Sequence, residues 1–185
     1  WVMRQPEENI ITIKEGFENY TQMTVDYIDV GKQVNDITVD KIEKVVSSIK
    51  DHDVVVVVVG ETPLRYDRKG KTTGENVARS SLDLFGKQLE MIQKIKMTGK
   101  PVIAVLVNGR PISEPWLVDN VDAIILALGS NDMLRGIDPS ETRENLRKIL
   151  EIGKNFELKL MVIGTPASNN FGPLYKKNLM PYIQI

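Results

Sequence analysis

Continuous apolar runs, each ended by a glycine or a turn, recur along the chain. The strongest is DVVVVVVGE at residues 53–61; PVIAVLVNG (101–109), DAIILALG (122–129) and KLMVIGTP (159–166) repeat it, with a weaker run, MTVDYID, at 23–29. Uninterrupted β-branched runs are typical of strands covered on both faces, as in parallel sheets. The pattern therefore predicts a mostly parallel sheet of five or more strands.

Helical patterns fill the segments between these runs. VDKIEKVVSSIKD, from residue 39, and FGKQLEMIQKIKMTGK, from residue 85, each carry one apolar stripe at helical spacing. DPSETRENLRKILEIG, at 138–153, begins with an Asp-Pro capping signal and ends on glycine. Residues 7–20 also have a helical pattern, although no strand precedes them. Because alternating strands and helices require crossover connections, we expect a three-layer α/β/α sandwich with a flavodoxin-like sheet.

Composition limits the classes of partner and site. The chain has 185 residues, 42% of them hydrophobic, so we expect a single domain over residues 1–185. A net charge of -1 argues against nucleic acid as a partner, and the absence of cysteine excludes thiolate chemistry. No apolar run approaches the roughly 18 to 20 residues that span a bilayer, and we expect no signal peptide before Trp1. We expect no membrane association, no metal and no cofactor, while oligomeric state and localisation stay open.

Polar side chains follow the predicted strands. Glu61 ends the first strong run, Asn108 and Arg110 follow the second, and Ser130, Asn131 and Asp132 follow the third. Ligands of open parallel sheets bind at this carboxyl edge, where a carboxylate, a guanidinium and amides could hold a polyhydroxylated substrate or an oxyanion. The alternative is that these residues only cap strands and turns.

A family resemblance gives these residues further meaning. Val-Val-Gly-Glu at 58–61, Thr-Gly-Lys-Pro-Val at 98–102 and Asn-Gly-Arg-Pro at 108–111 closely resemble the C-terminal α/β-sandwich domain of family 3 glycoside hydrolases, the β-glucosidase family, over about residues 1–127. The resemblance implies that Glu61 matches an acid/base position of some members, with Asp67 and Glu75 as nearby alternatives. It also implies that the nucleophilic aspartate lies on a separate barrel domain, so Glu61 would be vestigial here.

A second resemblance begins near residue 124. LGSNDMLRGI, ENLRKIL and NNFGPLYKK are similar to the later part of an SGNH hydrolase of the arylesterase or thioesterase type, over about residues 124–185. It implies that Gly129 and Asn131 are a vestigial oxyanion block. The serine of that chemistry has no counterpart, and the one histidine, His52, precedes the strand at 53–59, about 20 Å from the carboxyl edge.

The two resemblances meet inside one predicted strand, DAIILALG. Natural fusions join whole domains through linkers, so we interpret the chain as an engineered chimera of parts 1–127 and 128–185. The leading hypothesis is an α/β scaffold without a complete active site. The alternative is a β-glucosidase-type glycoside hydrolase fragment or carbohydrate-binding domain, with weak sugar contacts from Asn108 and Arg110. A further alternative is an SGNH esterase-like hydrolase.

Overall fold

The computed structural model describes residues 11–20, 22–62, 70–74, 77–128, 132 and 135–164, in two units. The first unit, Trp1–Val30, contains helix α1 (Ile13–Glu18). Thr12 and Glu15 begin this helix with a capping box, and the Lys14 ammonium lies 5.0 Å from the centre of the Tyr27 ring. No residue of α1 is buried. Local capping and one cation–π contact therefore shape this unit, which has no core within its described residues.

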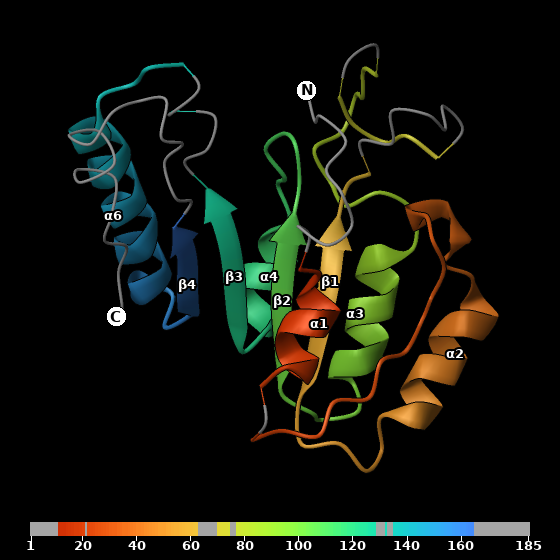
Figure 1. Ribbon diagram of the computed structural model, residues 1–185. Coiled ribbons are helices and arrows are strands. Elements are labelled where there is room, and N and C mark those ends of the chain that lie inside the picture. The colour runs from red at the N-terminus through yellow and green to blue at the C-terminus, as the bar shows by residue number, and fades with distance from the viewer. Residues whose placement is uncertain are drawn as a thin grey trace. The chain divides into compact units, whose positions relative to one another are not determined.

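The second unit, Gly31–Ile185, holds the parallel sheet. Its strands are β1 (Val55–Gly60), β2 (Val102–Val107), β3 (Ala123–Leu128) and β4 (Lys159–Gly164), and they follow one another across the sheet in chain order (Figure 1). Its helices are η2 (Val34–Asp36), α2 (Val39–Ser48), α3 (Gln88–Lys96), α4 (Pro115–Asn120) and α6 (Pro139–Asn155). The predicted α/β class is confirmed as a four-stranded, all-parallel sheet flanked by helices.

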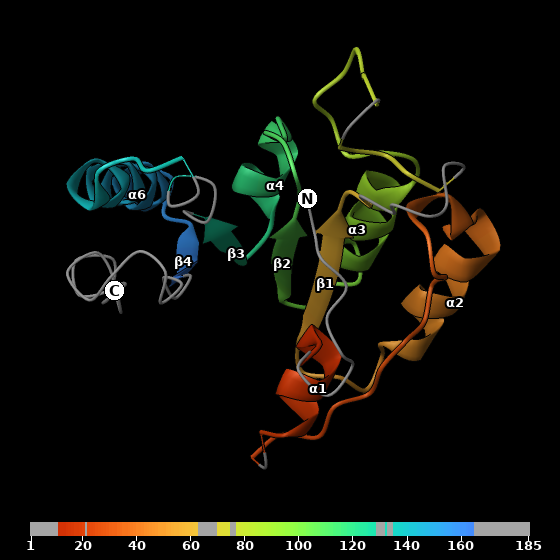
Figure 2. The ribbon, with the colours of Figure 1, turned by 45° about the horizontal axis from the view of Figure 1, so that its top comes forward.

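Strand order explains where the connecting helices lie. Each step from β1 to β4 moves in the same direction, so right-handed crossovers bring the connecting helices to one face. Figure 2 shows α3, α4 and α6 along the same side of the strands. On that face, the register aligns Val57, Ala104 and Ile124, all buried. Farther along the sheet, Leu146 and Leu150 of α6 pack against Val162 of β4. The core therefore lies between the sheet and this helical layer.

The weakest predicted strand is absent. Residues 23–29 are described without any strand, and Met23 and Tyr27 are exposed. The prediction was wrong because this run alternates apolar residues with Asp26 and Asp29, which favours a strand only where a neighbouring strand pairs with it. Within the described residues the sheet has four strands, so a fifth strand and a flavodoxin-like third layer stay predictions.

Candidate functional site

A glycine places Glu61 at the carboxyl edge of the sheet. Gly60, the last residue of β1, has φ +140°, and a Cβ added there would collide with the Val107 carbonyl of β2. A side chain is therefore excluded by both the backbone conformation and the space. The next amide, Glu61 N–H, donates to the Val107 carbonyl over 2.9 Å. This close approach continues the β1–β2 pairing by one bond and fixes where the Glu61 side chain begins.

Gln88, the first residue of α3, clamps the same turn. Its Oε1 accepts from Gly60 N–H at 2.7 Å, and its Nε2 donates to the carbonyls of Gly60 and Phe85, each at 2.9 Å. Gln88 is buried, so these bonds satisfy polar groups that water does not reach. The amide therefore joins the end of β1 to the start of α3.

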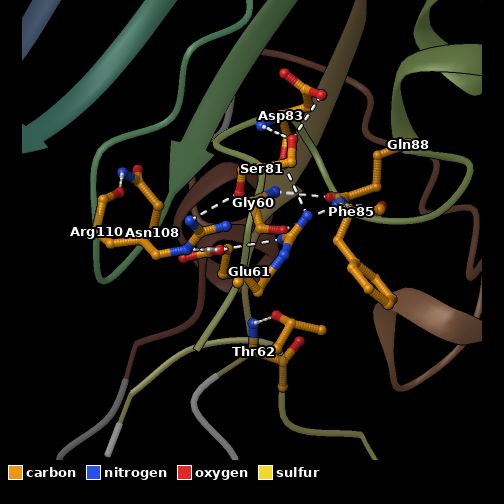
Figure 3. Close-up of polar contacts among 11 residues, drawn as sticks. Gly60, Glu61, Thr62, Ser81, Asp83, Phe85, Gln88, Asn108 and Arg110 are labelled. Atoms are coloured by element: carbon orange, nitrogen blue, oxygen red, sulfur yellow. Dashed lines mark hydrogen bonds and ion pairs between the residues drawn. The ribbon is translucent and has the colours of Figure 1, made fainter. Parts of the chain in front are cut away.

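Glu61 lies at the centre of an ion-pair cluster, which we call the arginine node: Glu61, Arg79 and Arg110 (Figure 3). Arg110 Nε donates to Glu61 Oε1 at 2.5 Å, and Arg79 Nη1 donates to the same oxygen at 3.4 Å. The Glu61 side chain is 1% exposed, against 15% for Arg79 and 20% for Arg110. The carboxylate is thus buried beneath two guanidinium groups that retain some contact with solvent.

The arginine node also holds two loops. Arg110 Nη1 donates to the Ser81 carbonyl at 3.0 Å, and Arg79 Nη2 donates to the Asp83 carbonyl at 3.3 Å. The Arg79 guanidinium lies 4.8 Å from the centre of the Phe85 ring. Through these contacts, one buried carboxylate organises the loop before α3 and the loop after β2.

Neighbouring polar groups shape the rest of this edge. Asn108 Nδ2 donates to the Arg110 carbonyl at 2.6 Å, which closes the turn after β2. Thr62 N–H donates to Thr72 Oγ1 at 2.8 Å, and Thr72 N–H donates to the Thr62 carbonyl at 2.9 Å. Beside the same loops, burial and then the nearby Asp83 carboxylate raise the pKa of Glu114.

Two polar atoms of the arginine node lack a hydrogen-bond partner among the described residues. Glu61 Oε2 and Arg110 Nη2 are buried and unpartnered within the described part of the chain. Buried polar atoms of this kind lower the stability of the fold unless water or another group forms a hydrogen bond with them. The node is therefore sensitive to loss of either partner.

The structure brings together three of the predicted site residues, Glu61, Asn108 and Arg110. Gly129, Asn131, Asp67 and Glu75 lie outside the described residues. His52 lies between α2 and β1, at the end of β1 opposite Glu61. The described residues contain no group of three or more acidic or histidine side chains that could hold a metal ion, and no helix among them is long and apolar enough to cross a membrane.

Sequence reasoning missed the roles of Arg79 and Gln88. Arg79 belongs to a polar loop without periodicity, and its contact with Glu61 spans eighteen positions of chain. Gln88 carried a weak signal, because a polar residue occupies a helical position three after Phe85, on the stripe that faces the core.

A comparison with protein-family models identifies the family to which these residues belong. The glycosyl hydrolase family 3 C-terminal domain matches residues 2–132, which include β1, β2, β3 and the whole arginine node. The chain belongs to this family. The match confirms the first resemblance and extends it beyond residue 127.

Individual relatives give the same family. The chain is 38% identical over 95 residues to a beta-xylosidase of Formosa agariphila, covering 51% of this chain and 12% of that protein. It is 34% identical to a periplasmic beta-glucosidase of Salmonella typhimurium, over 45% of this chain and 10% of that protein. A lysosomal beta glucosidase of Dictyostelium discoideum is 30% identical over 63% of this chain and 14% of its own length. The chain thus matches a small part of each relative.

The interpretation as a non-catalytic engineered chimera is wrong. The family match continues through β3 to residue 132, across the junction expected at residues 127 and 128. It also includes Gly129 and Asn131, which had been assigned to the second resemblance. The comparisons lend no support to an SGNH part. The apolar run AIILAL of β3 carries little family information, because many parallel sheets use the same pattern for a central strand.

Proposed function

We propose that this chain is the C-terminal α/β domain of a family 3 β-glycosidase acting on glucosides or xylosides. The family match over residues 2–132 carries the proposal, and relatives named as a beta-xylosidase and as beta-glucosidases indicate the class of substrate. The carboxyl edge of the sheet, where ligands of parallel sheets bind, would face the sugar.

The chemistry requires a second carboxyl group. Retaining glycosidases place a nucleophile and an acid/base about 5 Å apart on either side of the scissile bond. Among the described residues of this edge, Glu61 is the buried carboxylate, and two arginines occupy one of its oxygens. We therefore propose that the nucleophile comes from the barrel domain that the family resemblance implies.

For Glu61 we propose a positioning role. Its side chain is 1% exposed, and it accepts from Arg110 and Arg79, so it holds the loops at this edge in place. A general acid must instead reach the glycosidic oxygen and carry a proton. Asn108 and Arg110 would support the sugar site by fixing the turn after β2.

A domain replacement tests the proposal. The C-terminal domain of the Formosa agariphila beta-xylosidase is exchanged for this chain, and hydrolysis of p-nitrophenyl xyloside and p-nitrophenyl glucoside is measured. We expect activity well above that of the same enzyme lacking the domain, and loss of that gain in Arg110→Met. Arg147→Met, on the exposed face of α6, is the matched control. A folded hybrid that hydrolyses neither glycoside would contradict the proposal.

A further inference from the structure

An apolar cleft, which none of Glu61, Arg79 and Arg110 lines, lies between α4 and α6. Its volume is about 520 Å³. Leu106, Leu126 and Leu160 of the sheet form its floor, Leu117 lies on the α4 side, and Ile149 lies on the α6 side. Figure 2 shows both helices on the same side of the sheet. A volume of this size falls within the range of small-molecule sites, roughly 300 to 1,000 Å³.

The rim of this cleft is apolar on one side and acidic on the other. On the α6 side, Ile152 and Phe156 are 56% and 57% exposed, although both line the cleft. On the α4 side, Glu114 and Asp119 are the charged groups among the described lining residues, which include no lysine, arginine or histidine. Any ligand therefore meets hydrocarbon on the floor and negative charge along one edge.

Neither carboxylate has a counter-ion among the described residues. No described lysine or arginine forms an ion pair with Glu114 or Asp119. Burial, and then the nearby Asp83 carboxylate, raise the pKa of Glu114, while the Leu84 backbone lowers it in part. A cation beside Glu114 would offset both unfavourable effects, because it favours the ionised carboxyl.

We propose that this cleft binds a small apolar ligand that carries one cationic group. The hydrocarbon packs on Leu106, Leu126 and Leu160, and an ammonium donates to the Glu114 carboxylate. Apolar surface supplies most of the affinity of such a site, and a few polar groups at its edge fix the orientation of the ligand. The site is independent of the glycosidase proposal, since Glu61, Arg79 and Arg110 do not line the cleft.

Three probes with one skeleton test the charge preference: 4-phenylbutylamine, 4-phenylbutanol and 4-phenylbutyrate. Isothermal titration calorimetry measures the binding of each probe to the full chain. We expect saturable binding of the amine, about tenfold tighter than that of the alcohol, as one charge-assisted hydrogen bond allows. The carboxylate probe should bind more weakly than the alcohol.

Variants connect the preference to the proposed residues. Glu114→Gln should reduce affinity for the amine about tenfold and leave affinity for the alcohol unchanged. Glu144→Gln, on the exposed face of α6, is the matched control and should change neither. Ile149→Trp should narrow the cleft and weaken binding of all three probes, with folding checked by circular dichroism. Equal binding of amine and carboxylate probes, or no saturable binding of any probe, would overturn the proposal.

Discussion

Removing Arg110 should be among the most damaging single changes to this domain. In Arg110→Met the Glu61 carboxylate, 1% exposed, loses its 2.5 Å partner and retains Arg79 at 3.4 Å. Removal of one partner from a buried ion pair costs about 3 to 5 kcal/mol of unfolding free energy. Because Arg79 remains, and because Arg110 is itself 20% exposed, we expect about 3 kcal/mol, the lower end of that range.

A double-mutant cycle assigns this loss to the ion pair. Glu61→Gln keeps the size of the side chain and a hydrogen-bond acceptor, and Arg110 can still reach water. We therefore expect the unfolding free energy to fall by about 1 to 2 kcal/mol. Once both charges are gone, neither is left unpaired. The unfolding free energy of the double variant should therefore fall by about 2 kcal/mol less than the sum of the two single losses. Coupling of this size is common between residues in contact.

Urea denaturation followed by circular dichroism measures all four unfolding free energies, and urea does not screen charge. Arg147→Met is the control, because Arg147 forms its ion pairs with Glu144 and Glu151 on the exposed face of α6. Its unfolding midpoint should stay close to that of the unmodified chain. Additive losses in the cycle, or a loss below about 1 kcal/mol in Arg110→Met, would refute the reasoning.

Two further changes test the contacts around the sheet. Gln88→Leu keeps the volume but leaves the Gly60 amide and carbonyl without their side-chain partners, so urea titration should show a loss of about 3 kcal/mol. Asp122→Ala removes the carboxylate whose pKa is lowered by the hydrogen bond from Lys96 and then by that from the Val102 amide. The stability from Asp122 is present above the ordinary pKa of 3.8 and is lost as the pH falls through the lowered value. Thermal denaturation should therefore find Asp122→Ala less stable by about 1 kcal/mol at neutral pH, with the difference vanishing in acid.

Buried strands were the most predictable part of the fold. The run at 53–61 became β1 at Val55–Gly60, and the run at 101–109 became β2 at Val102–Val107. These segments could be predicted because burial on a parallel sheet requires the same apolar residues whatever the neighbouring strand is. The order of the strands was less predictable, since it depends on contacts between segments that no local pattern records.

The candidate site was predictable only where it follows the strands. Glu61, Asn108 and Arg110 meet because the carboxyl ends of β1 and β2 are neighbours in a parallel sheet. Arg79 reaches the same carboxylate from a loop, where neither spacing nor hydrophobic period restricts the position of a side chain. Sequence patterns therefore located the carboxylate and missed one of its two cations.

Two variants distinguish a positioning role of Glu61 from a role as the catalytic acid/base. In a hybrid that hydrolyses glycosides, Glu61→Gln removes the proton of an acid/base but keeps an acceptor for Arg110. If Glu61 acts by positioning, kcat of Glu61→Gln should fall together with its unfolding free energy. Arg110→Met, which leaves Glu61 in place, should then lower activity at least as much. If Glu61 is instead the acid/base, activity should be abolished in Glu61→Gln and only reduced in Arg110→Met. Because Glu61 Oε1 is held by two arginines and its side chain is 1% exposed, we expect the first result.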